Sequence, residues 1–201
     1  MLEIIDLVLV NSTKINEHGN RASEIVKGML MHSRGDSGEF QDTDLNRLAD
    51  EYFHLAFHGM RAEHKDFNTE MLAEYDENMG FVKVVPQDIS RVIINIVNNA
   101  CFAVYEKSKK EPPGAYKPQI KIKTRRINDK AMIYVWENGN GYSENIIEKI
   151  CSPFFTTKPT GKGTGLGLSI SHDIITQTHK GKLDIKSNSG EFSEFIITLP
   201  V

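Results

Sequence analysis

The N-terminal part of the chain has the hydrophobic spacing of a helix that packs against another helix. Residues 4–33 contain two interleaved sets of residues, each with a spacing of seven. One set is Val8, Ile15, Ala22 and Met29, and the other is Asn11, His18, Ile25 and His32. Alternating steps of three and four residues are typical of the seam of a helical bundle. Because one helix cannot bury such a seam alone, we predict that this long helix forms a homodimer.

Small polar residues and glycines interrupt this pattern between Ser33 and Gly38, which predicts a hinge. We therefore divide the chain into a dimerisation helix with its hinge, residues 1–38, and a second domain, residues 39–201.

The second domain alternates between helical and strand-like patterns. Helices are expected from Asp42 or Thr43 to about His58, from Gln87 to Lys107 after Pro86, and from Leu166 to Thr178. Strands are expected at residues 67–76, 81–85, 119–127, 131–137, 182–187 and 194–199, the first two on either side of a turn at 78–80. Helices followed by mixed strands predict an α+β fold, a two-layer sandwich in which helices cover one face of a sheet.

Composition narrows the class of protein further. The chain of 201 residues is 39% hydrophobic and 25% charged, which is typical of a globular domain, and its net charge of -3 gives no reason to expect nucleic acid as a partner. No run approaches the roughly 20 apolar residues of a membrane span, so we expect no membrane contact by this chain. Cys101 and Cys151 lack metal-ligand spacing, and we expect them to be reduced thiols of a cytoplasmic protein.

Two asparagines stand out in the helix expected after Pro86. Asn95 and Asn99 are four residues apart, so they share one helix face, and hydrophobic residues flank them. A buried carboxamide needs a partner, and neutral oxygen ligands suit Mg²⁺ when phosphates supply the remaining charge. Taken alone, ordinary capping or surface asparagines are the simpler interpretation.

Three glycine-containing or aromatic segments follow. Glu137-Asn138-Gly139-Asn140-Gly141 places an acid and two glycines at the end of a strand, where the backbone can turn sharply beside a ligand, although a plain tight turn explains the pattern equally well. Ser152 to Lys158 contains two adjacent phenylalanines that could anchor a lid, and we expect one of them to pack in the core.

The densest glycine cluster runs from Gly161 to Ser169 and leads into a helix. Glycines allow close approach of the backbone to phosphates, and the helix N-terminus offers free N–H groups and a positive dipole end. The cluster lacks the closing GK[ST] of a Walker A loop, and it does not follow a strand as a dinucleotide fingerprint does.

In this order and spacing, the four segments resemble the N, G1, F and G2 boxes of histidine kinases, which belong to the ATP-binding superfamily shared with gyrase, MutL and the heat-shock chaperone ATPases. The resemblance covers residues 43–200. It extends to Lys14–Ala22 and Ile25–Leu30, which look like the second dimerisation helix of one group of bacterial sensor kinases. It implies a Bergerat-type ATP-binding fold, ATP and Mg²⁺ as ligands, and the receiver domain of a response regulator as a partner.

The resemblance also implies residue roles. Asn99 would ligate Mg²⁺, Asn95 would support the phosphates and the metal, and Glu137 would bond the adenine amino group. Asn95, Asn99 and Lys158 would form the catalytic group. Further nucleotide contacts would come from the pocket floor and lid, namely Gly139, Gly141, Phe155, Lys158, Gly163, Thr164, Gly165, Leu166, Gly167 and Leu168, with Phe154 also in the lid.

The residue at position 95 favours a kinase over an ATPase. ATPase members of the superfamily usually have a glutamate there, which acts as general base for water. A carboxamide cannot accept that proton, so the pattern favours phosphoryl transfer to histidine, whose neutral imidazole needs no base.

Three features depart from the histidine kinase pattern. Glu137 replaces the usual aspartate, which could weaken nucleotide binding by about 1–3 kcal/mol, and Phe102 stands where many relatives have a basic residue. None of the seven histidines has the acid and the proline that follow an acceptor histidine, and His18 and His32 lie on the predicted seam. We therefore expect the acceptor histidine in trans or on a helix that this chain lacks.

Two other functions stay open at this point. A degenerate kinase that dimerises or binds a partner without efficient catalysis is the main alternative. A serine-kinase anti-sigma factor fits less well, because the long seam helix and the lid phenylalanines have no place in it.

Overall fold

The computed structural model describes residues 38–159 and 163–201, together with residues 5, 8, 11, 12, 14, 15 and 19. These seven N-terminal positions are helical, as predicted for residues 4–33. The rest of the predicted dimerisation helix and its hinge lie outside the described residues, so the seam and the domain boundary remain predictions.

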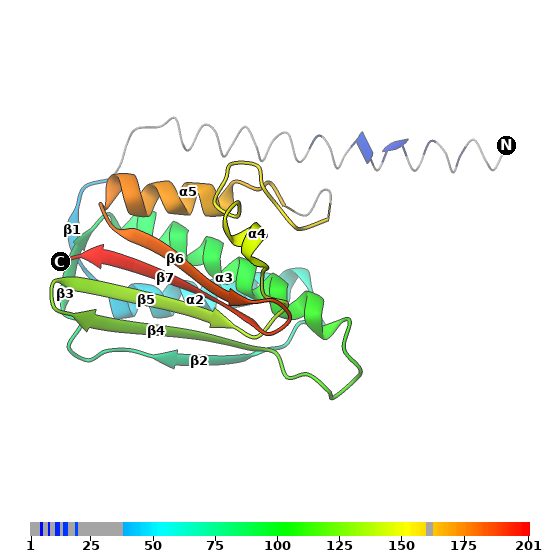
Figure 1. Cartoon of the computed structure of the whole chain (residues 1–201), viewed down its shortest axis with the longest axis horizontal. Helices are drawn as coiled ribbons and strands as arrows, with labels where there is room; N and C mark the ends of the chain where they lie inside the picture. The colour runs from blue at the N-terminus through cyan, green and yellow to red at the C-terminus, as the bar shows by residue number, and fades with distance from the viewer. Residues whose placement is uncertain are drawn as a thin grey trace.

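The second domain has two layers (Figure 1), as the α+β prediction required. The strands are β1 (Gln41–Asp44), β2 (Glu70–Glu74), β3 (Phe81–Val84), β4 (Gln119–Ile127), β5 (Lys130–Glu137), β6 (Lys182–Asn188) and β7 (Phe192–Pro200). The helices are α2 (Leu45–Glu63), α3 (Pro86–Ser108), α4 (Glu144–Ile147), α5 (Gly167–Asp173) and the π-helical segment η1 (Ile174–Thr178).

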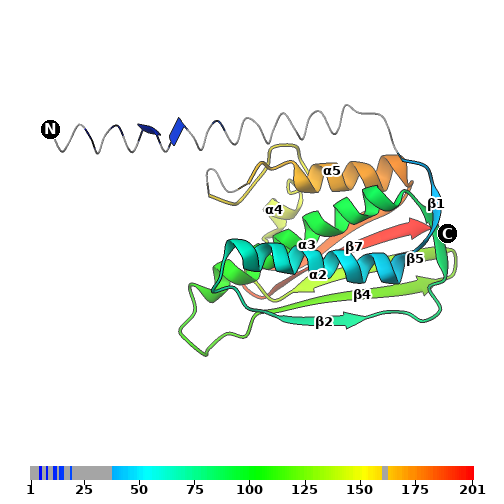
Figure 2. The same cartoon turned by 180° about the vertical axis from the view of Figure 1, so that it is seen from behind.

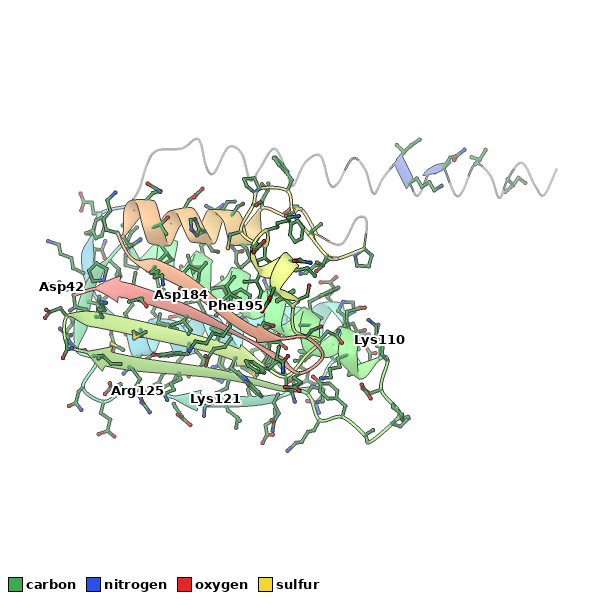
Figure 3. All side chains as sticks on the ribbon, in the orientation of Figure 1. Asp42, Lys110, Lys121, Arg125, Asp184 and Phe195 are labelled. Atoms are coloured by element: carbon green, nitrogen blue, oxygen red, sulfur yellow. The ribbon has the colours of Figure 1, made fainter. Side chains whose placement is uncertain are left out.

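The main sheet has the order β2-β4-β5-β7-β6, and α2, α3 and α5 cover one of its faces (Figure 2). All neighbours are antiparallel except β2 and β4, which run parallel, so the sheet is mixed. Buried and partly exposed residues alternate along β4 and β5, as expected for a sheet with one covered face. Phe195 of β7 is buried beneath the helices, whereas Lys121, Arg125 and Asp184 are partly exposed (Figure 3).

Helix α3 forms the centre of the core. It begins with Pro86 in its first turn, as predicted, and one side of it is buried over its whole length. The buried residues are Ile89, Ser90, Val92, Ile93, Ile96, Val97, Ala100, Cys101, Val104 and Tyr105. A helix held this firmly gives the polar residues on its other side fixed positions.

The predicted start and end of α2 were both wrong. Residues 41–44 form β1, which pairs with β3, so the helix begins later than a cap at Asp42 or Thr43 would allow. Asp44 is the cap, and its side chain accepts a hydrogen bond from the Arg47 N–H at 3.1 Å. The helix continues to Glu63 rather than His58, because Met60 is still buried against the core.

The two strands predicted around residues 78–80 do not pair with each other. β2 pairs with β4, and β3 pairs with β1 in a separate two-stranded sheet. Asp76 directs the chain away from a hairpin, because its carboxylate accepts the N–H groups of Asn78 at 3.0 Å and Arg126 at 2.8 Å. The short helix α4 was not predicted. None of its residues is buried, so its sequence has no helical spacing of hydrophobic residues.

Candidate functional site

The two predicted asparagines lie on α3 and are both half-buried, whereas Asn98 between them is exposed. The Asn95 side-chain N–H₂ donates to the Gly167 carbonyl and to the Ser171 hydroxyl, both at 3.2 Å. These contacts join α3 to the beginning of α5, where the glycine-rich segment ends. Two segments 70 residues apart in the sequence are thereby brought together, and the Asn95 carboxamide is held in one orientation.

Asn99 has a different environment. It lies one helical turn after Asn95 and is half-buried on the same face of α3. The described residues also contain no group of three or more His, Cys, Asp or Glu side chains placed to hold a metal ion. A cation here would therefore be ligated by a carboxamide oxygen together with oxygens of a bound anion, and Asn99 fits that donor set.

Glu137 is the last residue of β5 and only 1% exposed. Its carboxylate turns back on its own loop and accepts the N–H of Gly139. Burial raises the pKa of Glu137, and hydrogen bonds from Ser193 and Gly139 together with the charge of Lys107 oppose that rise. The Glu137 carboxylate is thus held against the loop that follows it.

Residues 138–141, here called the floor loop, are tightly packed. A Cβ on Gly139 would lie 2.8 Å from the Ala103 carbonyl carbon of α3. Gly141 has a φ of +58°, and a Cβ there would lie 2.0 Å from the Asn188 carbonyl oxygen. Both glycines are therefore required by close backbone approach, as their positions in the sequence suggested.

Two side chains that hold this loop, those of Lys107 and Tyr116, were not predicted from the sequence. The Lys107 ammonium, at the end of α3, donates to the carbonyls of Asn138 at 3.0 Å, Gly139 at 3.0 Å and Gly190 at 2.8 Å. The Asn138 carboxamide bonds the Tyr116 hydroxyl at 2.8 Å together with backbone groups of residues 117 and 119. The only sequence signal for Lys107 was a lysine in the last turn of a helix, a common place for one.

The lid is defined here as residues 152–159 and 163–168, and its side chains are more exposed than those of the floor loop. Phe155 is half-buried and packs against the core, which confirms that one of the two phenylalanines belongs there, whereas Phe154 is 50% exposed and has a φ of +66°. Lys158 reaches across to α3, with its Nζ 4.4 Å from the centroid of the Phe102 ring.

The glycine-rich part of the lid is described from Gly163 onward, and residues 160–162 lie outside the described residues. Gly165 has a φ of +70°, and a Cβ there would lie 2.4 Å from the Phe154 carbonyl carbon. Leu168 is buried in the core, while the predicted contacts Thr164 and Leu166 are half-buried. Gly165 thus packs on the aromatic segment of the lid, and Leu168 joins the C-terminal end of the lid to the core.

Five histidines lie among the described residues, and all have surface or packing environments, as predicted. His179 is the most buried: its Nε2 accepts the Val85 N–H at 3.1 Å, and its Nδ1 faces the Ile174 carbonyl at 2.9 Å. His18 and His32 lie outside the described residues, so their predicted place on the seam is untested.

Comparison with known proteins agrees with this geometry. Residues 84–201 match the family model described as histidine kinase-, DNA gyrase B-, and HSP90-like ATPase. The chain is 32% identical over 192 residues to the sensor kinase CckA of Brucella abortus and 28% identical over 201 residues to the signal transduction histidine-protein kinase AtoS of Escherichia coli. These alignments cover 92% and 99% of the chain, but only 20% and 29% of the two relatives.

A solved structure is similar as well. The catalytic domain of histidine kinase ThkA, in a nucleotide-free form, aligns with 81% of this chain and 96% of its own, at 34% identity and a TM-score of 0.66. Among the described residues, no helix is long and apolar enough to cross a membrane. The chain belongs to the family of histidine kinase-, DNA gyrase B- and HSP90-like ATPases, within which it carries the ATP-binding catalytic domain of a sensor histidine kinase.

Proposed function

We propose that this domain binds Mg-ATP and transfers the γ-phosphoryl group to a histidine supplied in trans or by a segment outside these 201 residues. One observation carries the proposal. Asn95 and Asn99 share a face of α3, and Asn95 is hydrogen-bonded to the start of α5, where the glycine-rich lid ends. Phosphates bound there would meet carboxamide oxygens and the free N–H groups of the lid.

The chemistry at Asn95 favours a kinase. Its N–H₂ group is engaged by Gly167 and Ser171, and a carboxamide cannot remove a proton from water in any orientation. A neutral imidazole is a nucleophile without deprotonation, so the domain has only to position the phosphates and stabilise their charge. Asn99 would ligate Mg²⁺, which when bound neutralises charge on the phosphate oxygens. Lys158 would add a positive charge from the lid.

Glu137 would hold the adenine end of the nucleotide, with Gly139 and Gly141 shaping the surface beneath it. The remaining nucleotide contacts would come from the lid, namely Phe155, Gly163, Thr164, Gly165, Leu166, Gly167 and Leu168. The partners proposed for the whole protein are a second copy of the chain and a response regulator receiver domain. Val8 and Ile15 support dimerisation, because both are more than half exposed and lie seven residues apart on the predicted seam.

Titration calorimetry with a non-hydrolysable ATP analogue and Mg²⁺ tests the proposal, with Glu137→Asp measured alongside. We expect micromolar-range binding by the unaltered chain. Labelled ATP and a purified acceptor-helix protein should then yield acid-labile, base-stable phosphate on histidine. Binding by neither chain would overturn the assignment of the nucleotide site.

A second candidate is a degenerate module that binds a partner and not nucleotide. It is favoured by the Glu137 carboxylate, which is already engaged by the Gly139 N–H and is almost completely buried. If that contact keeps the carboxylate from adenine, only Glu137→Asp will bind the analogue. Binding by the unaltered chain would exclude this candidate.

A further inference from the structure

The contact between Lys158 and Phe102 links the lid to α3. Phe102 is half-buried. The Lys158 ammonium lies 4.4 Å from the centroid of its ring. A cation within about 6 Å of an aromatic centroid is attracted by the electrons of the ring face. The lid therefore brings a positive charge to the place where the helix itself has none.

Helix geometry places this cation near the two asparagines. Residues three and four apart share a helix face, so Phe102 continues the line of Asn95 and Asn99. The axial distance from Asn99 to Phe102 is about 4.5 Å, at 1.5 Å per residue. The next residue, Ala103, is where the floor loop packs, within 3 Å of a Cβ built on Gly139. Phe102 thus lies between the asparagines and the floor loop.

The surroundings of Lys158 explain why it needs a partner. Burial lowers the pKa of the Lys158 ammonium, and the charge of Glu63 at the end of α2 opposes that effect. Glu63 is mostly exposed and forms no ion pair with Lys158 in the described part of the chain, so its charge acts through space. The face of Phe102 is the group in direct contact with the ammonium, and it replaces part of the water that the ammonium has lost.

We infer that Phe102 is a positioning residue that holds the Lys158 ammonium beside Asn99, where this cation contacts the phosphates of the nucleotide. The inference rests on the proposed nucleotide binding. It differs from that proposal in assigning a role to an aromatic residue that touches neither metal nor adenine. The ring acts through Lys158, so its effect must disappear when the lysine is removed.

The test compares nucleotides with and without phosphates on the full 201-residue chain. Affinities for the non-hydrolysable ATP analogue are measured by calorimetry, and those for adenosine by competition. Phe102→Leu keeps the apolar bulk but removes the ring, and we expect it to weaken binding of the analogue about 3- to 30-fold, the range that a cation–π contact supplies. Adenosine affinity should not change, and Phe102→Tyr should bind the analogue like the unaltered chain.

Lys158→Met supplies the control for coupling. In that background Phe102→Leu should cause no further loss of affinity, since the cation that the ring holds is gone. An equal loss of adenosine and analogue binding in Phe102→Leu would overturn the inference, because it would show a general packing role. A loss that persists in the Lys158→Met background would overturn it too, as would tighter binding by Phe102→Leu. If the unaltered chain binds no analogue, the proposed function itself fails, which is a different result.

Discussion

The floor loop and the lid are both rich in glycine and would both contact the nucleotide, yet the fold holds them very differently. The floor loop is fixed by Lys107, by the Asn138 carboxamide and by a 2.6 Å hydrogen bond from the Gly190 N–H to the Asn140 carbonyl. In the lid, the hydrogen bond from the Leu166 N–H to the Thr164 hydroxyl is 3.4 Å long.

The difference has a physical consequence. A loop whose backbone is already fixed loses little entropy when a ligand binds, so the floor loop is preorganised. A more exposed segment opens at lower free-energy cost, so we expect the lid to move more readily than the floor loop when a nucleotide binds. Glycines allow close backbone approach in both loops, and the two loops differ in how deeply their side chains are buried.

The largest expected difference between the two loops is the loss of stability when a matched glycine of each is substituted. We expect Gly141→Ala to lower the free energy of unfolding by about 3–5 kcal/mol, since its positive φ and the overlap with Asn188 are both costly. Gly165→Ala has a similar φ and a similar overlap with Phe154, but the lid can shift, so we expect a loss below about 1 kcal/mol. Chemical denaturation measures both. Equal losses would mean that the lid is as rigid as the floor loop.

Removing the lysine that fixes the floor loop should have the next largest effect. Lys107→Met deletes three hydrogen bonds from an ammonium and should cost about 2–4 kcal/mol of stability, with weaker binding of the ATP analogue. Lys110, an exposed lysine at the end of the same helix (Figure 3), provides the control. Lys110→Met should change neither property, and a similar change in both variants would indicate a general effect of charge.

Deleting one hydroxyl beside the floor loop and one in the lid should give a smaller difference of the same sign. The Ser187 hydroxyl accepts the Tyr142 N–H and donates to the Phe192 carbonyl, both at 2.7 Å, so Ser187→Ala should cost about 1–3 kcal/mol. Among the described residues, the Thr164 hydroxyl accepts the long bond from Leu166 and no other, and Thr164→Ala should cost less than about 0.5 kcal/mol. Thermal melting at one pH measures both, and the reverse order would contradict the comparison.

The smallest effect is a dependence on pH. The pKa of Glu137 is raised above 4.5 in the fold, so the folded state binds its proton more tightly than the unfolded state. This stabilisation is present below pH 4.5 and is lost as pH rises through the folded pKa. The Glu137→Gln side chain cannot ionise, so this variant does not lose that stabilisation. The melting temperature of Glu137→Gln minus that of the unaltered chain should therefore increase as pH rises.

Glu70 provides a control of opposite sign. Hydrogen bonds from Lys117 and Gln119 lower its pKa, so its stabilisation is present above pH 4.5 and lost as pH falls. Glu70→Gln should therefore differ from the unaltered chain most at neutral pH and least in acid. If the difference in melting temperature between Glu137→Gln and the unaltered chain does not change with pH, burial does not raise the pKa of Glu137.

The sequence by itself determined the elements whose signals are local. The helix at α3, the β4–β5 and β6–β7 hairpins and the sandwich class all follow from hydrophobic period, proline and turn residues close together in the chain. The candidate site segments were found the same way, because glycines and carboxamides at fixed spacing are visible without a partner.

Only the tertiary structure decided the contacts between distant segments. The parallel pairing of β2 with β4, the bond from Asn95 to Ser171, the ammonium of Lys158 over Phe102 and the direction of the Glu137 carboxylate all depend on residues that meet through folding. Pairing between distant strands and side-chain direction are set by packing and burial of the whole domain, and no local pattern encodes them.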